Sequence, residues 1–352
     1  MPSNKYDRLP QAGDTEKQSD TDFFYLAPNP LPIGVAVLSS KHVCRPITEE
    51  CMDVATGTAT LEYGARSGIG IITCMIIFFF LIGLGMGISE HLRYGDPVLE
   101  ITKEFILPNG YLWAFIALLA SMYIHSFSRA VRKLTRSSPI RFNRQRREVA
   151  YVAKRGQPPR FVPWEEVIAC VTSGKVITQY GTHNSFSLMI GLRSSASGDV
   201  VWITLPAGSL MLAVSEWEAI RAYMEEGPNA LPKPLSEEHE EGTVAYFQFC
   251  RQAYRDTYSY PRYLFGFLMI QFCSGWTLPC HIAAWVRRLP KTSFPKSVLE
   301  WSRPIAPEKW QKPSDELIEQ SKAVRKSLQA GLSFFDHFQG GETPEASRPN
   351  PK

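Results

Sequence analysis

The sequence predicts an α+β membrane protein. A transmembrane helical hairpin comes first, followed by a small antiparallel β-barrel or sheet domain capped by a C-terminal helix, and then by a helical C-terminal region. Three observations predict this class: two long uncharged apolar runs at 67–88 and 105–128, a set of short alternating segments after them, and an amphipathic stretch near 215–226. A helix that is apolar on every face must lie in lipid or in a large core.

Residues 1–66 precede the apolar runs, and we expect a partly disordered N-terminal cytoplasmic segment. Residues 1–22 are polar and poor in apolar side chains, which is typical of disorder. Residues 23–65 hold short apolar patches broken by Pro and Gly, and the pattern leaves open whether they join the later domain.

The hairpin is expected over 67–128, because about 20 apolar residues span the roughly 30 Å hydrocarbon layer. The loop between the runs is net acidic, whereas eleven Lys or Arg residues and the single acid Glu148 lie between Arg129 and Arg160. Basic residues gather on the cytoplasmic side of membrane helices. We therefore expect a multi-pass protein of the bacterial inner membrane, with the N-terminus and main soluble domain cytoplasmic.

The basic cluster is interpreted first as a topology signal and second as a contact for anionic lipid head groups. A nucleic-acid partner is not favoured, because the membrane already accounts for these side chains. The cluster comprises Arg129, Arg132, Lys133, Arg136, Arg141, Arg144, Arg146 and Arg147.

Gly83 and Gly87 form a GxxxG pair inside the first run. Small residues at this spacing let helices approach closely. The pair is interpreted as a packing face for the second helix of the hairpin, and a homodimer contact is the alternative.

The soluble domain is expected over 139–228. Its predicted strands include 148–152, 185–193 and 199–205, and a helix is expected over 215–226. Ser215 and Glu218 fit a capping box at the start of that helix, and Trp164, Trp202 and Trp217 are expected in the core.

After this domain we expect a linker at 229–242, an aromatic-rich helical region at 243–338 that docks or associates with the membrane, and a disordered tail at 339–352. Within the region 243–338, residues 263–286 form a third uncharged run with basic residues on both flanks. A single crossing would leave one basic flank outside, against the usual bias. The alternatives are a span, or a helix pair that is re-entrant, at the membrane surface or buried in protein.

No motif in the sequence indicates catalysis. Walker, dinucleotide-binding, GxSxG and HExxH patterns are absent from the sequence. The seven cysteines are scattered and are interpreted as free thiols. Cys273, Cys280 and His281 are candidate metal ligands, but their spacing matches no common metal motif. We expect a non-enzymatic protein with no catalytic residues, no cofactor and no metal.

The order of elements resembles pleckstrin-homology-like domains of bacterial membrane proteins. The elements are a membrane hairpin, a basic segment directly after it, strands containing Pro163-Trp164-Glu165-Glu166-Val167, and a terminal helix. The longer chain is similar to an uncharacterised family of two-pass proteins often encoded beside type VI secretion genes. Arg141-Phe142-Asn143-Arg144, Trp164-Glu165, Trp276, Leu278-Pro279 and Trp285 carry this resemblance.

The resemblance implies an immunity or accessory protein that binds a delivered toxin or a secretion component. The alternative is a membrane-anchored lipid-sensing or membrane-organising protein. It would use the basic cluster to bind anionic head groups.

Overall fold

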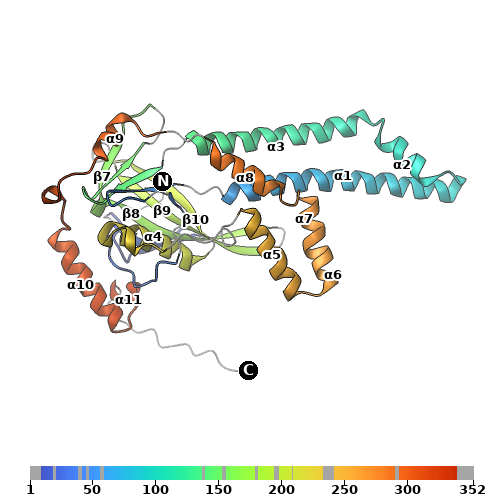
Figure 1. Ribbon diagram of the computed structural model, residues 1–352. Helices are drawn as coiled ribbons and strands as arrows, with labels where there is room; N and C mark the ends of the chain where they lie inside the picture. Colours follow the sequence, from blue (N-terminus) through green and yellow to red (C-terminus); the bar gives the residue numbers. More distant parts are fainter. Residues whose placement is uncertain are drawn as a thin grey trace, which may run out of the picture. The chain divides into compact units, whose positions relative to one another are not determined.

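The computed structural model divides the chain into two compact units (Figure 1). The sheet unit comprises Met1–Gly57, Ser137–Pro234 and Thr292–Lys352, and the helical unit comprises Thr58–Arg136 and Leu235–Lys291. The structure describes residues 9–18, 21–38, 42–44, 47–55, 59–136, 139–152, 156–178, 181–193, 198–207, 209–232, 242–289 and 293–338. The predicted tail at 339–352 and most of the predicted linker lie outside these residues.

The sheet unit contains two five-stranded antiparallel sheets. The first has the strand order β1 (Thr15–Gln18), β2 (Thr21–Ala27), β8 (Ile168–Thr178), β9 (Gly181–Arg193) and β10 (Val200–Ala207). The second has the order β3 (Val43–Cys44), β4 (Cys51–Val54), β5 (Ile140–Asn143), β6 (Glu148–Tyr151) and β7 (Arg160–Pro163).

Alternation along the strands explains the core between the sheets. In β9, the side chains of Leu188, Ile190 and Leu192 are buried, because alternate residues of a strand face the same side. Strand β2 adds Leu26 and strand β5 adds Phe142 to the same core. Each fully buried large apolar side chain contributes roughly 1.5–3 kcal/mol to folding.

Helix α4 (Leu210–Glu226) packs into this core with Trp217, Ile220, Tyr223 and Met224. Trp164 lies beside Trp217, with ring centroids 5.3 Å apart. The other helical segments of the sheet unit are η1 (Trp164–Glu166), η2 (Pro228–Ala230), α9 (Lys296–Trp301), η5 (Pro307–Lys309), α10 (Asp315–Gln329) and α11 (Phe334–Phe338).

Two details of the expected helix and core are wrong. Ser209, and not Ser215, caps α4, because its side chain accepts a hydrogen bond from the Leu212 amide. Ser215 instead accepts one from the Leu38 amide at 2.7 Å. Trp202 is 41% exposed, because it lies on the face of strand β10 opposite the buried Leu205, whereas Trp164 and Trp217 are fully buried as expected.

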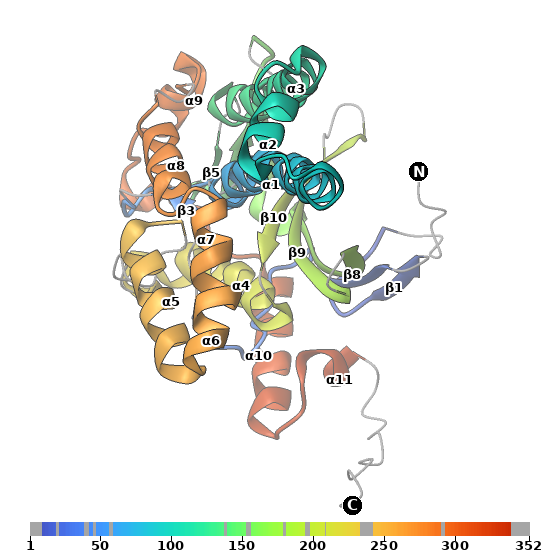
Figure 2. The ribbon, with the colours of Figure 1, turned by 90° about the vertical axis from the view of Figure 1, so that its right-hand side faces the viewer.

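The helical unit comprises two long helices with a short helix between them (Figure 1), followed by a group of shorter helices (Figure 2). In chain order these are α1 (Ala59–Tyr94), α2 (Val98–Ile106), α3 (Gly110–Arg136), α5 (Val244–Thr257), α6 (Tyr260–Tyr263), η4 (Leu264–Leu268), α7 (Met269–Cys273) and α8 (Leu278–Arg288).

Among the described residues, two helices are long and apolar enough to cross a membrane: Leu61–Tyr94 and Gly110–Arg136. The first contains the predicted run 67–88, whereas the second begins five residues later than predicted. Phe105 belongs to α2, because Pro108 and Asn109 interrupt the helix and the Asn109 side chain accepts the Leu112 amide at the start of α3.

The predicted α+β class with two long apolar helices is confirmed, but the β domain is not a closed barrel. The N-terminal segment supplies β1 to β4, including strand β1 where disorder was expected. The predicted region 243–338 is divided between the units, with 293–338 in the sheet unit. Strands and helices from three separate segments therefore complete the domain that the sequence confined to 139–228.

Candidate functional site

A buried arginine organises the candidate site. Arg147 lies in the turn between β5 and β6 and is 8% exposed. Its guanidinium donates to both carboxylate oxygens of Glu225 at 3.0 and 2.9 Å, and to Glu165 at 3.2 Å. The Trp164 indole N–H also donates to Glu225, at 2.9 Å. Bidentate, charge-assisted bonds of this kind fix geometry as well as supplying energy.

The local sequence explains the turn that carries Arg147. The Asn143 side chain accepts the Arg146 amide at 3.0 Å, which is a short-range turn bond typical of Asn. Arg147 itself has φ +48°, in the left-handed region that non-glycine residues rarely adopt. The amide of Trp164 donates to the Arg147 carbonyl at 2.8 Å and secures this conformation.

A cavity of about 860 Å³ opens beside this turn, and we call it the charged groove. Three walls form it: the β5–β6 turn, the β7–η1 corner and the segment 305–312. The residues that line it are Asn29, Arg146, Arg147, Glu148, Pro163, Trp164, Glu165, Glu166, Ile305, Lys309, Gln311 and Lys312.

Three charged residues of the groove lining are exposed. The side chains of Glu166, Lys309 and Lys312 are exposed, and among the described residues none of the three has an ion-pair partner. At the base, the Nε atom of Arg147 is buried and lacks a hydrogen-bond partner within the described chain. The groove therefore combines a fixed, buried charge network with free charges of both signs.

Gln145 holds the third wall of the groove in place. Its carbonyl accepts the Gln311 amide and its side chain accepts the Ile305 amide, both at 2.9 Å. The Glu165 carboxylate accepts the Ser314 amide at 3.1 Å, which secures the start of α10. The wall is thus attached to the turn that carries Arg147.

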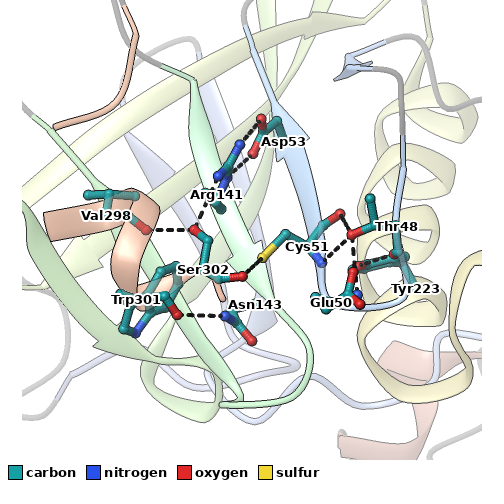
Figure 3. A network of polar contacts seen from close by, with 10 residues as sticks. All are labelled: Thr48, Glu50, Cys51, Asp53, Arg141, Asn143, Tyr223, Val298, Trp301 and Ser302. Atoms are coloured by element: carbon teal, nitrogen blue, oxygen red, sulfur yellow. Dashed lines mark hydrogen bonds and ion pairs between the residues drawn. The ribbon is translucent and has the colours of Figure 1, made fainter. Parts of the chain in front are cut away.

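A second network attaches helix α9 to strands β4 and β5 (Figure 3). Arg141 forms a bidentate pair with Asp53 at 2.7 and 2.8 Å and donates to the Ser302 hydroxyl at 3.1 Å. The Arg146 guanidinium donates to the Trp301 carbonyl, and the Trp301 indole donates to Glu148. These contacts hold the C-terminal segment on strands β5 and β6.

The two cysteines Cys51 and Cys170 of the sheet unit are not activated as nucleophiles. Burial raises the pKa of the Cys51 thiol to about 11, against a smaller opposing effect of Arg141. Burial also raises the pKa of Cys170 to about 12. Both thiols are protonated at neutral pH, and the thiolate is the reactive form. Within the described residues, no group of His, Cys, Asp and Glu is arranged to hold a metal ion.

The predicted basic cluster is divided between two places. Arg129, Arg132, Lys133 and Arg136 are exposed on the last turns of α3. The other four arginines lie in the sheet unit, where Arg141, Arg144 and Arg147 form ion pairs and Arg146 binds the Trp301 carbonyl. Only the four residues of α3 among these eight are exposed.

Gly83 and Gly87 face α2 within the same chain. A Cβ atom on Gly87 would lie 2.6 Å from the Val98 carbonyl oxygen and 2.9 Å from the Thr102 hydroxyl. One on Gly83 would lie 3.0 Å from the Phe105 ring. The close approach favours intramolecular packing, although with the short helix α2 in place of the second long helix.

Sequence reasoning missed the acidic and C-terminal parts of the groove. Glu225 lies at the end of α4 and Lys309 and Lys312 lie in a Pro-rich segment, so no local motif joins them to Arg147. The available signal was the pair Trp164-Glu165, a large aromatic beside an acid in a strand-to-helix corner.

These features define an α+β protein with two potential membrane helices and a charged groove. The chain belongs to a family of unknown function, DUF6708, whose model matches residues 116–313. That region contains every lining residue of the groove except Asn29. No curated protein and no solved structure matches the chain.

Proposed function

We propose that the chain is a non-enzymatic, membrane-anchored protein whose sheet unit binds a protein partner in the charged groove. The observation that carries the proposal is the groove itself, with its exposed Glu166, Lys309 and Lys312 around the fixed Arg147 network. Pockets for small molecules are mostly apolar with few polar groups. A groove with charges of both signs instead matches a partner segment of complementary charge, and complementary charge confers specificity.

The two-pass topology belongs to the same proposal. Helices α1 and α3 cross the membrane as a hairpin, and the sheet unit lies in the cytoplasm beneath a bacterial inner membrane. The pairing of β4 with β5 supports this topology, because these neighbouring strands flank the hairpin in the sequence and must lie on one side. The basic end of α3 favours the cytoplasm for that side.

The resemblance to proteins encoded beside type VI secretion genes suggests which partner is bound. We propose a delivered toxin or a component of the secretion machinery, with the chain acting as an immunity or accessory protein. A membrane anchor would hold such a protein where a toxin acting on the inner membrane arrives.

The experiment is quantitative affinity capture of the tagged full chain from detergent-solubilised native membranes. The test variant carries Lys309→Glu and Lys312→Glu in the groove. The control carries Lys322→Glu and Arg325→Glu, an equal charge change at two exposed positions of α10 outside the groove. We expect one stoichiometric protein with the wild type and the control, and its loss with the test variant.

Capture of the same proteins by all three chains would contradict the proposal, as would capture of none. The immunity version has its own test. Cells lacking the chain should lose in competition with an isogenic attacker, and only when that attacker has an active type VI apparatus.

A lipid-sensing function is the second candidate, and the exposed Arg129, Arg132, Lys133 and Arg136 at the end of α3 favour it. Each basic residue near an anionic surface contributes about 1 kcal/mol to binding. Changing all four to Gln should then remove co-purifying anionic lipid while leaving capture of the protein partner unchanged.

A further inference from the structure

The helices α5 to α8 expose an apolar surface that the two-pass topology does not explain. Leu264, Phe265, Met269, Ile270, Phe272 and Trp285 are all exposed, and Phe272 is 79% exposed. Their inward neighbours Phe247, Tyr263 and Phe267 form a small core with Cys280. The group is therefore a folded helical element with a second, uncovered apolar face.

Contacts with α1 fix the position of this helical element along α1. The Arg66 guanidinium donates to the Gln271 side chain at 2.5 Å and to the Trp276 carbonyl at 3.1 Å. Arg66 also pairs with Glu62. These bonds hold the bend between α7 and α8 against the N-terminal end of α1.

The bend enters the apolar run of α1 by only one turn. A Cβ atom on Gly275 would lie 3.0 Å from the Ile69 side chain, and one on Gly70 would lie 3.7 Å from Ser274. Cys280, one turn into α8, is already back at the level of Glu62 and Arg66. The bent pair therefore turns back near the end of α1 that precedes its apolar run.

The sheet unit excludes a single crossing. Its C-terminal segment binds strands β5 and β6 through Trp301 and Phe294. Chain segments that fold together lie on one side of a membrane, so the stretch between the sheet-unit residues 232 and 293 crosses twice or not at all.

The arms of the pair are too short for two crossings. The pair comprises Tyr260–Cys273 and Leu278–Arg288, bent by 45°. At 1.5 Å per residue the arms measure about 21 and 16 Å, whereas the hydrocarbon layer is about 30 Å thick. Neither arm reaches the far side.

We propose that α6 to α8 form a re-entrant helix pair, whose apolar face lies in the head-group and acyl-chain boundary of the leaflet at the N-terminal end of α1. Amphipathic helices of this kind bury their apolar face about 5–10 Å into that boundary. Continuity with α1 identifies lipid as the occupant, because the contacts with Ile69 and Gly70 bring the bend to the start of the membrane run. Arg262 and Arg288 are exposed at the two ends of the pair, where they match anionic head groups.

This inference goes beyond the proposed function and does not depend on a protein partner. It is tested in the full-length chain, with its native cysteines replaced and single cysteines introduced at exposed positions. Asp96→Cys reports the far side, Gln252→Cys and Glu300→Cys report the two ends of the stretch, and Phe265→Cys and Phe272→Cys report the apolar face. Each is labelled in sealed native membrane vesicles with a water-soluble or a lipid-soluble maleimide.

We expect Gln252→Cys and Glu300→Cys to react with the water-soluble reagent from the same side, and Asp96→Cys from the opposite side. Phe265→Cys and Phe272→Cys should not react with the water-soluble reagent but should react with the lipid-soluble one. Labelling of Glu300→Cys from the side opposite Gln252→Cys would overturn the inference in favour of a span. Ready labelling of both phenylalanine positions by the water-soluble reagent would place the pair outside the bilayer and overturn it as well.

Discussion

Two arginines in one turn show how much burial changes the role of a charge. Arg147 is 8% exposed and its partner Glu225 is 18% exposed, whereas Arg144 pairs at 3.4 Å with Glu49, which is 58% exposed. Exposed ion pairs contribute about 0–1 kcal/mol. Removing one partner of a buried pair costs far more, because the other charge is left buried without compensation.

We therefore expect Arg147→Ala to lower the free energy of unfolding by about 3–5 kcal/mol, because Glu225 and Glu165 lose their shared partner. Arg144→Ala is the matched control and should cost about 1 kcal/mol or less. Denaturant titration of the detergent-solubilised protein, followed by tryptophan fluorescence, measures both. Equal effects would show that the Arg147 network does not stabilise the sheet unit.

The buried thiols make the sheet unit sensitive to alkaline pH. The pKa of Cys170 in the folded chain is about 12, against an ordinary value of 9.0. Because the pKa of this thiol is higher in the folded than in the unfolded chain, its contribution to the free energy of unfolding is fully present below pH 9. That contribution is lost as the pH rises toward 12. The loss is about 1.4 kcal/mol per pH unit for each such thiol. Unfolding temperatures at pH 8 and pH 10 should differ less for Cys170→Ala than for the wild type, and an unchanged difference would exclude this cause.

At the scale of elements, helix α9 illustrates what the sequence alone could not predict. Its six residues carry no helix signal strong enough to stand alone, and strand β6, on which it packs, lies about 150 residues earlier in the chain. The long runs at 67–88 and 105–128 were predictable, because a membrane helix carries its whole signal locally. Strands β2 and β4 were not, because they pair with β8 and β5, which are distant in the sequence.

Helix α9 should depend on one buried side chain. Val298 is fully buried against Ala150, whereas its neighbour Leu299 is 48% exposed. Val298→Asp places an unpaired charge in that contact, so we expect α9 to detach and the segment 293–305 to become sensitive to protease. Leu299→Asp should leave the digestion pattern unchanged. Equal sensitivity of the two variants would argue against this docking.

The glycines of α1 allow a similar paired test. Gly87→Leu would collide with the Val98 carbonyl of α2, whereas a Cβ atom on Gly85 meets no atom within 4 Å. We expect Gly87→Leu to lower the unfolding temperature in detergent by several degrees and Gly85→Leu to have little effect. The oligomeric state, measured by light scattering, should not change in either variant. Dissociation of a dimer by Gly87→Leu alone would instead support the homodimer interpretation of this glycine pair.

At the scale of the whole molecule, the sheet unit is one domain assembled from three stretches of chain. Strand β4 precedes the long helices and β5 follows them, yet they pair directly, with Val54 opposite Ile140. The groove shares this origin, because Asn29, Trp164 and Lys309 come one from each stretch. Composition and motif could identify the membrane helices, but the segment 305–312 joins the groove only through its hydrogen bonds to Gln145, about 160 residues earlier in the chain.

The same pairing leads to a prediction about folding. The first part of the helical unit, Thr58–Arg136, lies in the sequence between Val54 and Ile140. These two residues are opposite one another in adjacent strands, so a short Gly/Ser turn can replace residues 57–137. A flexible linker of about 20 residues, which spans about 25 Å on average, can replace residues 235–291. Because the core residues of the two sheets and α4 all remain, we expect this shortened chain to be soluble and to unfold cooperatively on heating, as measured by circular dichroism.

The matched control lacks only residues 235–291 and keeps the long helices. It should stay in the membrane fraction after carbonate washing, because α1 and α3 remain. If the shortened chain is soluble only when unfolded, the sheet unit requires the helical unit for folding. If it folds but still sediments with membranes, a surface of the sheet unit binds lipid directly, and the lipid-sensing alternative gains support over a groove that binds only protein.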